Sequence, residues 1–413
     1  MAVSRLLGAD FVRASACLMV LAHHLAQRLD PNILPPAARS LYFFILKGSF
    51  GVAVFFVLSG YLLARPFWQA LDAGAPMPSL RIYALRRAAR IIPAFWLALA
   101  VTFVLSITVF AVPFDGSLVL RFLAGLFLVG DWHWSTLFPV EFNGPLWSIG
   151  FEVTSYVLLP LCLALLFWFR PRIAGAWTTR LLWVAIVALD VGVHWLIVRY
   201  LPVDKSNVGW QFGLQGGAKV WVPRFNPFGF FAIFALGALA GGVQVRLARH
   251  RSPIFVVAVA GMALALWSMA ASITDSEGEG FGLADLPYRF PVFPLAVALT
   301  LATLPSSVLL GRLADNPISV FVARVSFGLY VWHYLIIETV RQVWLPDLAY
   351  QQIHSTRLWL LISAIIVAIS FAIATASFYL LEQPIIRWAR GREPRLRGVH
   401  VRTGIRASSV AGS

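Results

Sequence analysis

Four polar side chains interrupt the first apolar segment of the chain, and their types and spacing suit acid–base chemistry. They are Asp10, Arg13, His23 and His24. On a helix, Arg13 and His24 would lie within roughly 20° of one face and about 16 Å apart along the axis, with Asp10 one turn from Arg13. An imidazole can take a proton from a hydroxyl group near neutral pH, and a guanidinium can hold an anion. The alternative is structural: an arginine that reaches the membrane surface and a histidine satisfied by a neighbouring helix.

Two further apolar segments carry polar side chains that could complete such a site. Glu152 lies in LWSIGFEVTSY, where a carboxylate must be protonated or paired. It could orient a histidine, or it could form a structural ion pair. The segment VSFGLYVWHY places Ser326, Tyr330 and His333 along one helical stripe. The alternative for this stripe is an aromatic belt at the membrane interface.

Three arginines precede the apolar segment that begins at Ile91. Arg86, Arg87 and Arg90 stand at the start of a helix that Pro93, in its first turn, would favour. Guanidinium groups gathered at a helix entrance form a candidate site for phosphate groups. The alternative is that they only signal topology, because basic residues collect on the cytoplasmic side of membrane proteins.

The composition indicates that membrane-spanning helices position these side chains. Of 413 residues, 60% are hydrophobic and 12% are charged, against about 25% charged in soluble domains. The mean hydropathy is +0.79. We therefore expect an all-α, polytopic bundle of about ten transmembrane helices, with no second catalytic module. The expected spans, each close to the roughly 20 residues that cross a bilayer, are 9–28, 43–64, 91–112, 144–168, 181–199, 227–245, 254–272, 289–305, 318–339 and 358–381.

The distribution of charge predicts the orientation of the bundle. The net charge of +15 is carried by arginines that gather in alternate loops, which favours a cytoplasmic location for these loops and for both termini. Contact with anionic lipids explains this charge better than binding to nucleic acid, which we do not expect. Residues 118–130 are too short to cross and are expected to form an interfacial or re-entrant helix on the outer face. Residues 1–388 should form the membrane domain and 389–413 a basic, disordered cytoplasmic tail.

Taken together, six motifs resemble the acyltransferase-3 family of bacterial membrane O-acyltransferases. They are GADFVRASACLMVLAHH, GVAVFFVLSGYLL, RRAARIIPAFW, LWSIGFE, VSFGLYVWH and FYLLEQPIIRW, in this order from Gly8 to Trp388. The second motif adds Ser59 and the fourth adds Trp147 to the candidate residues. The chain departs from the family pattern at Ala53 and Val153, where the family often has acidic residues.

The resemblance implies transfer of an acyl group, usually acetyl, from cytoplasmic acetyl-CoA to a hydroxyl of a glycan or glycolipid, in the bacterial inner membrane. His24 would be the base or a transient acyl carrier, and Arg13 would hold the donor or stabilise an oxyanion. Glu152 would orient the histidine or hold the acceptor. CoA phosphates would bind Arg86, Arg87 and Arg90, with support from Asp10, His23, Ser59, Trp147, Ser326, Tyr330 and His333. No metal is expected. The alternative is a proton-coupled secondary transporter, for which internal repeats would be typical.

Overall fold

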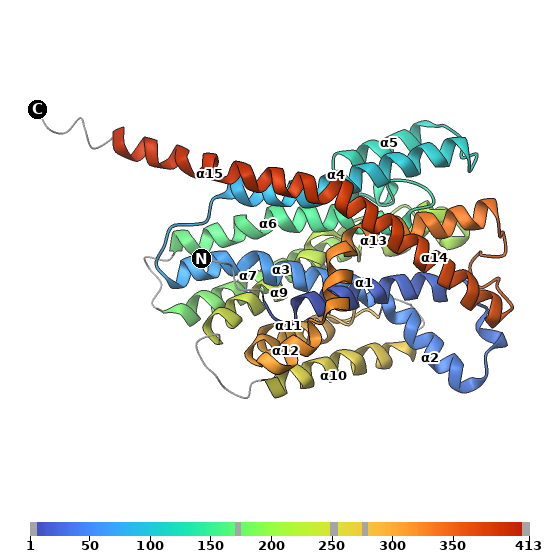
Figure 1. Ribbon diagram of the computed structural model, residues 1–413, viewed down its shortest axis with the longest axis horizontal. Coiled ribbons are helices and arrows are strands. Elements are labelled where there is room, and N and C mark those ends of the chain that lie inside the picture. The colour runs from blue at the N-terminus through green and yellow to red at the C-terminus, as the bar shows by residue number, and fades with distance from the viewer. Residues whose placement is uncertain (1–5, 170–174, 248–254, 275–279, 407–413) are drawn as a thin grey trace, which may run out of the picture.

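The chain folds as a bundle of helices. A computed structural model describes residues 6–169, 175–247, 255–274 and 280–406, and this part of the chain contains helices and turns but no β-strand (Figure 1). The longer helices are α1 (Ala9–Ala26), α3 (Gly51–Asp72), α4 (Leu80–Thr108), α6 (Trp147–Phe169), α7 (Ala176–Tyr200), α9 (Pro227–Leu247), α10 (Phe255–Ala271), α11 (Val292–Thr303), α13 (Pro317–Val343), α14 (Thr356–Ser377) and α15 (Gln383–Arg406). The shorter ones are α2 (Pro36–Leu46), α5 (Gly116–Leu126), α8 (Gly213–Trp221) and α12 (Val308–Ala314).

Each of the ten expected spans overlaps a helix, but fewer helices meet a strict test for crossing a membrane. Among the described residues, seven helical stretches are long and apolar enough, and an eighth qualifies if the α11–α12 pair, bent by 115°, counts as one span. The other two expected spans fall on α1, which carries the polar residues noted above, and on α10, which has 17 residues. The structure therefore supports a polytopic helical protein with seven or eight clear candidate spans.

The segment 118–130 forms the short helix α5, which folds back along α4. The indole nitrogen of Trp96 donates to the Leu126 carbonyl at 3.0 Å, and the rings of Phe103 and Phe122 lie 4.3 Å apart. With 11 residues, α5 is about 16 Å long, roughly half the hydrocarbon thickness of a bilayer. It therefore adds no crossing to the bundle.

Glycines let the two central helices α3 and α9 approach backbone to backbone. A Cβ added at Gly60 would lie 2.0 Å from the Phe234 carbonyl oxygen, and one at Gly237 would lie 1.9 Å from the Val57 carbonyl oxygen. Larger side chains are excluded at both positions by these distances. Helix α3 also packs against α1, α6 and α11, so it supports two of the helices that carry the polar residues described below.

A remote carboxylate fixes the start of α1. The Asp315 side chain accepts hydrogen bonds from the backbone N–H groups of Gly8 at 2.8 Å and Phe11 at 2.9 Å. The first turn of a helix leaves such N–H groups without intrahelical partners, and a carboxylate also suits the positive end of the helix dipole. Further along α1, the Cys17 thiol contacts the Ser326 carbonyl oxygen at 3.4 Å. These contacts set the position of α1 relative to α13.

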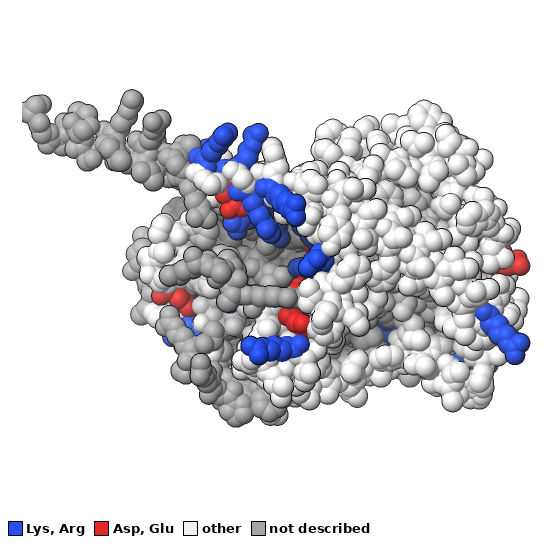
Figure 2. Space-filling model, viewed as in Figure 1, with Lys and Arg blue, Asp and Glu red and all other residues white. Residues whose placement is uncertain are grey.

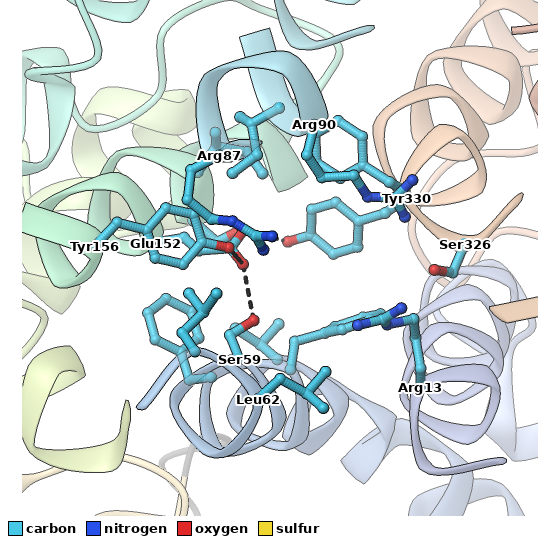
Figure 3. A pocket seen from close by; sticks show the side chains of 17 residues that line it. Arg13, Ser59, Leu62, Arg87, Arg90, Glu152, Tyr156, Ser326 and Tyr330 are labelled. Atoms are coloured by element: carbon cyan, nitrogen blue, oxygen red, sulfur yellow. Dashed lines mark hydrogen bonds between the residues drawn. The ribbon is translucent and has the colours of Figure 1, made fainter. Parts of the chain in front are cut away.

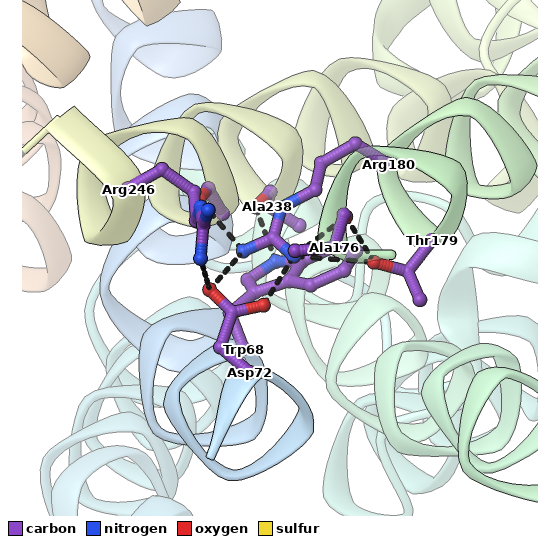
Figure 4. A network of polar contacts seen from close by, with 8 residues as sticks. Trp68, Asp72, Ala176, Thr179, Arg180, Ala238 and Arg246 are labelled. Carbon is purple, nitrogen blue, oxygen red and sulfur yellow. Dashed lines mark hydrogen bonds and ion pairs between the residues drawn. The ribbon is translucent and has the colours of Figure 1, made fainter. Parts of the chain in front are cut away.

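A buried ion pair joins one end of α3 to α7 and α9 (Figure 4). The Arg180 guanidinium donates to both Asp72 carboxylate oxygens and to the Gly242 carbonyl oxygen at 3.0 Å. Its carbon atom Cζ lies 4.6 Å from the centre of the Trp68 ring. Because both side chains are nearly inaccessible to solvent, the pair depends on its protein partners rather than on hydration.

Residues 389–406, which belong to the expected tail, form part of a helix that begins at Gln383. A π-helical turn, Phe378–Glu382, follows α14, and α15 then continues through Arg406. Glu393 binds Arg86 on α4, which anchors α15 to the rest of the bundle. The last seven residues of the expected tail, 407–413, lie outside the described residues.

We expect Asp72→Asn to destabilise the protein by about 3–5 kcal/mol, because it leaves the Arg180 charge buried without its counterion. Thermal unfolding in detergent would measure this effect. The matched control is Asp204→Asn, which removes an ion pair between a half-exposed carboxylate and Lys219 and should leave the unfolding midpoint unchanged. Equal shifts in the two variants would show that the Arg180 cluster does not hold α3, α7 and α9 together.

Candidate active site

Helices α1, α3, α4, α6 and α13 enclose a small cavity of about 90 Å³ lined by charged groups, which we call the charged pocket (Figure 3). Its polar lining residues are Arg13, Ser59, Arg87, Arg90, Ser148, Glu152, Tyr156, Ser326 and Tyr330. These residues come from segments up to about three hundred positions apart in the chain. The fold therefore gathers most of the candidates found in separate apolar segments into one place.

The charged pocket is electropositive. Arg87 and Arg90 are three residues apart on α4, so they share a helix face, and both lie within electrostatic reach of Arg13 on α1. Asp10 is also within electrostatic reach of Arg13. Among the lining residues, Glu152 is the one carboxylate that faces three guanidinium groups. Such a pocket is suited to an anionic ligand.

Neighbouring hydroxyl groups hold the carboxylate of Glu152. The Ser59 hydroxyl donates to Oε1 at 3.0 Å, and the Tyr156 hydroxyl donates to the same oxygen. Figure 3 shows Arg87 pointing toward this carboxylate. The hydrogen bonds of Glu152 are to Ser59 and Tyr156, and His24 is not among its described partners.

A second histidine orients His24 instead. His24 Nδ1 lies 2.9 Å from His333 Nε2, and His333 Nδ1 lies 2.9 Å from the carbonyl oxygens of both Leu329 and Tyr330. Carbonyl oxygens only accept hydrogen bonds, so a neutral His333 carries its proton on Nδ1 and presents a lone pair on Nε2. His24 Nδ1 must then be the donor to His333. This leaves the lone pair of His24 on Nε2, where it can accept a proton.

The side chain of Tyr330 separates this histidine pair from the charged pocket. Tyr330 lines the pocket, donates to the Pro145 carbonyl at 3.0 Å, and lies 2.6 Å from the Ser148 hydroxyl oxygen. Its ring centre is 6.1 Å from that of His333. Arg13 therefore lies in the pocket wall, whereas His24, on the same helix, lies beyond Tyr330.

Other expected site residues serve different purposes. Arg86 points away from the pocket and binds Glu393, while Arg90 lines the pocket and binds the buried Glu382 at 3.4 Å. The His23 ring contacts the Leu46 carbonyl oxygen and lies edge-on to the His24 ring. Trp147 packs in an aromatic cluster, and its ring centre lies 5.2 Å from that of Trp221.

Sequence reasoning missed a second buried ion pair, one turn beyond His24. Arg28 donates to Glu338 at 2.9 Å and to the Leu348 carbonyl at 3.2 Å, and its guanidinium lies 5.3 Å from the centre of the Tyr334 ring. The rings of Tyr334 and His24 are in edge contact. Arg28 follows His24 by four residues and lies within the expected span 9–28, so helical spacing could have added it to the candidates, although α1 itself ends at Ala26.

The position of α6 around Glu152 also depends on a residue that the sequence did not single out. Asp131, in the segment between α5 and α6, accepts a hydrogen bond from the Thr154 hydroxyl at 2.8 Å. Burial raises the pKa of Asp131 to about 6. Its carboxylate lies against Gly150, where an added Cβ would be 2.9 Å from Oδ1. Sequence reasoning could have found Tyr156, because it follows Glu152 by four residues, or one helical turn.

Comparisons with known proteins give a matching family model and several similar proteins. A family model described as an acyltransferase domain matches residues 6–377. The chain is 26% identical to the peptidoglycan O-acetyltransferase OatA of Listeria monocytogenes, covering 91% of this chain and 55% of that protein. It is 24% identical to nodulation protein 10 of Rhizobium leguminosarum, with 92% of each covered, and 24% identical to the O-acetyltransferase OatA of Staphylococcus aureus, with 81% and 51% covered. The chain thus spans about half the length of the two OatA proteins.

The hydrogen-bond directions predict the tautomer of His24. In spectra of protein labelled with ¹⁵N-histidine, the His24 signals, assigned by their loss in His24→Gln, should show a protonated Nδ1 and an unprotonated Nε2. His333→Phe removes the acceptor and should yield a mixture of tautomers. A proton held on Nε2 of neutral His24 in the unmodified protein would contradict the assignment.

Proposed function

Since the chain belongs to the acyltransferase-3 family, we propose that it transfers an acyl group, in the first instance acetyl, from acyl-CoA to a hydroxyl group of a sugar-containing acceptor. The observation that carries this proposal is a pocket lined by three arginines, with a histidine on the far side of Tyr330 whose Nε2 presents a lone pair for use as a base. The peptidoglycan acceptor in the name of one relative supports a glycan acceptor. Because the chain belongs to an acyltransferase family, we propose acyl transfer rather than the alternative of proton-coupled transport.

The proposed orientation places the start of α4 and the start of α15 at the cytoplasmic face of a bacterial inner membrane, with all ten expected helices crossing. The charged side chains support this arrangement. On the face drawn in Figure 2, basic side chains gather at one end of the molecule, and most of the remaining surface is uncharged. A cytoplasmic donor would thus meet the basic end first.

Arg87 is the proposed main contact for a phosphate of CoA. Arg86 is engaged by Glu393 and Arg90 by Glu382, whereas Arg87 points into the charged pocket. Arg13 would hold the arm of the donor deeper in the pocket. Arg13 and His24 are separated by a rise of about 16 Å along α1. Arg13 is therefore too distant to stabilise an oxyanion at the carbonyl beside His24.

The proposed chemical step begins when the acceptor hydroxyl gives its proton to His24 Nε2. The hydroxyl oxygen attacks the thioester carbonyl, the carbon–sulfur bond breaks, and the departing thiolate takes the proton from His24. The products are the acylated sugar and free CoA. His333 would keep the His24 proton on Nδ1 throughout, as an orienting group does for a general base. The same lone pair on Nε2 would also serve the alternative route, in which His24 attacks the thioester and carries the acyl group transiently.

His24→Ala should lower the rate of acyl transfer by about 10²- to 10⁴-fold, the usual contribution of a general base, while leaving thermal stability close to that of the unmodified protein. The assay measures CoA released from acetyl-CoA by purified protein, with and without a muropeptide acceptor. His354→Ala is the control, because that side chain is exposed and pairs with Asp30. Full transfer activity in purified His24→Ala protein would remove the proposed base.

Arg87→Ala should weaken CoA binding about ten- to a hundredfold, because it removes a charge-assisted contact, and the loss should shrink as salt is raised. Titration calorimetry with CoA at two salt concentrations would measure it. Arg86→Ala is the matched control one residue away, since Arg86 binds Glu393 outside the pocket. Equal affinities of the Arg87 and Arg86 variants for CoA would show that these arginines only determine the topology of the protein.

A further inference from the structure

Three charged side chains form a second cluster beyond His24, at the opposite end of α1 from Arg13. Arg28 and Arg341 both bind Glu338, the first at 2.9 Å to Oε1 and the second at 2.6 Å to Oε2. Arg28 lies just past the end of α1, and Arg341 lies in the last turn of α13. We call these three residues the outer charged cluster.

The outer charged cluster carries one more positive charge than negative charge. Among the described residues, Glu338 is the one carboxylate within salt-bridge distance of either guanidinium group. Glu141 precedes Phe142, whose ring faces Arg341, but Glu141 is itself paired with Arg121 at 2.6 Å. A partly buried charge without a counterion is costly, so the cluster favours the binding of an anion.

Arg341 is the member of the cluster that a ligand can reach. Its side chain is 26% exposed, against 5% for Arg28 and 6% for Glu338. Arg341 donates to Glu338 through Nε, which leaves its two terminal nitrogen atoms able to donate to a further anion. The side chains of His24 and Tyr334 are also partly exposed. A ligand at Arg341 could therefore extend toward the histidine pair.

The cluster is close enough to His24 for one ligand to contact both. The Arg28 guanidinium lies 5.3 Å from the centre of the Tyr334 ring, and that ring centre lies 4.9 Å from the centre of the His24 ring. Arg28 is therefore no farther than about 10 Å from the His24 ring, and one carboxylate joins it to Arg341. A hydroxyl at His24 and an anionic group at the cluster can belong to one disaccharide.

The surroundings of the histidine pair are also positive. Lys47 and Arg28 both lie within electrostatic reach of His23, and Arg28 lies within electrostatic reach of His24. A positive potential raises the local concentration of anionic ligands. This part of the site thus attracts an anionic acceptor toward the base as well as toward Arg341.

A purely structural role would not require two arginines. Arg28 alone neutralises Glu338, and it is the more buried of the two guanidinium groups. It also donates to the Leu348 carbonyl and hydrogen-bonds Tyr334, so it holds this end of the bundle together. Arg341 is the additional charge, and it is the one at the accessible surface.

Building on the proposed function, we propose that the outer charged cluster binds an anionic group of the acceptor, so that the protein acylates an acidic sugar, carrying a carboxylate or a phosphate, in preference to a neutral one. Arg341 contacts the anion, while Arg28 and Glu338 hold Arg341 in place. The hydroxyl to be acylated then lies at His24 Nε2. A charge-assisted contact of this kind strengthens binding about ten- to a hundredfold.

The test compares three disaccharides of the same linkage: cellobiose, cellobiouronic acid and a phosphorylated cellobiose. Calorimetry measures the Kd of each, and CoA release from acetyl-CoA measures its KM, on the full chain in lipid nanodiscs. The acidic disaccharides should bind about ten- to a hundredfold more tightly than cellobiose, and added salt should reduce the difference. The tighter of the two acidic ligands identifies the preferred anion as a carboxylate or a phosphate.

Arg341→Gln removes the accessible charge and leaves Glu338 paired with Arg28, so this variant should fold. It should lose the preference for acidic disaccharides, with the Kd for cellobiose and the KM for acetyl-CoA unchanged. Arg341→Lys keeps the charge and should keep most of the preference. Arg199→Gln is the matched control, because it removes an exposed positive charge at the end of α7 and should leave every value unchanged.

Two results would overturn the acidic-acceptor proposal: equal affinities for the acidic and neutral disaccharides, or an acidic preference that persists in Arg341→Gln. Acyl transfer to the disaccharides without an acidic preference would leave the proposed function standing. Selective binding of the acidic disaccharides without release of CoA would instead overturn the proposed function and retain the anion site.

Discussion

The hydrogen bond between His24 and His333 can form only if α1 and α13 are held in one register, and the proposed chemistry depends on it. Asp315 fixes the start of α1 by accepting hydrogen bonds from two backbone N–H groups. In the middle of α1, Cys17 contacts α13. An unpaired polar group is costly in an apolar interior, so each of these contacts also favours the single packing arrangement in which all are made.

Tyr330 divides the site into two parts with different chemistry. On one side, arginines and Glu152 form a pocket suited to an anionic donor; on the other, two histidines and the Arg28–Glu338 pair lie around the aromatic rings of α13. This division is consistent with two substrates that approach from opposite faces of a membrane. In the proposed reaction the carbonyl would have to pass Tyr330, so this side chain would lie at the boundary between donor and acceptor.

The sequence predicts the positions of the helices better than it predicts the side-chain contacts between them. Apolar runs locate the helices of the ten expected spans, and polar residues within or just before these runs identify Arg13, Arg87, Arg90, Glu152, Ser326 and Tyr330, all of which line one pocket. Pairing depends on packing between distant segments, as in His24 and His333, which are 309 residues apart. For the same reason Arg86 and Arg87 could not be distinguished: helical rotation turns one toward Glu393 and the other into the pocket. The contact that anchors α15, between Glu393 and Arg86, is remote in the same way.

The most direct test of the central claim is an experimental structure of the protein bound to a thioether analogue of acetyl-CoA, which cannot transfer its acetyl group. We expect a CoA phosphate beside Arg87, the arm of the analogue along Arg13, and the carbonyl carbon past Tyr330 within reach of His24 Nε2. Binding of the analogue elsewhere, or a carbonyl that stays on the Arg13 side with Tyr330 unmoved, would contradict the account.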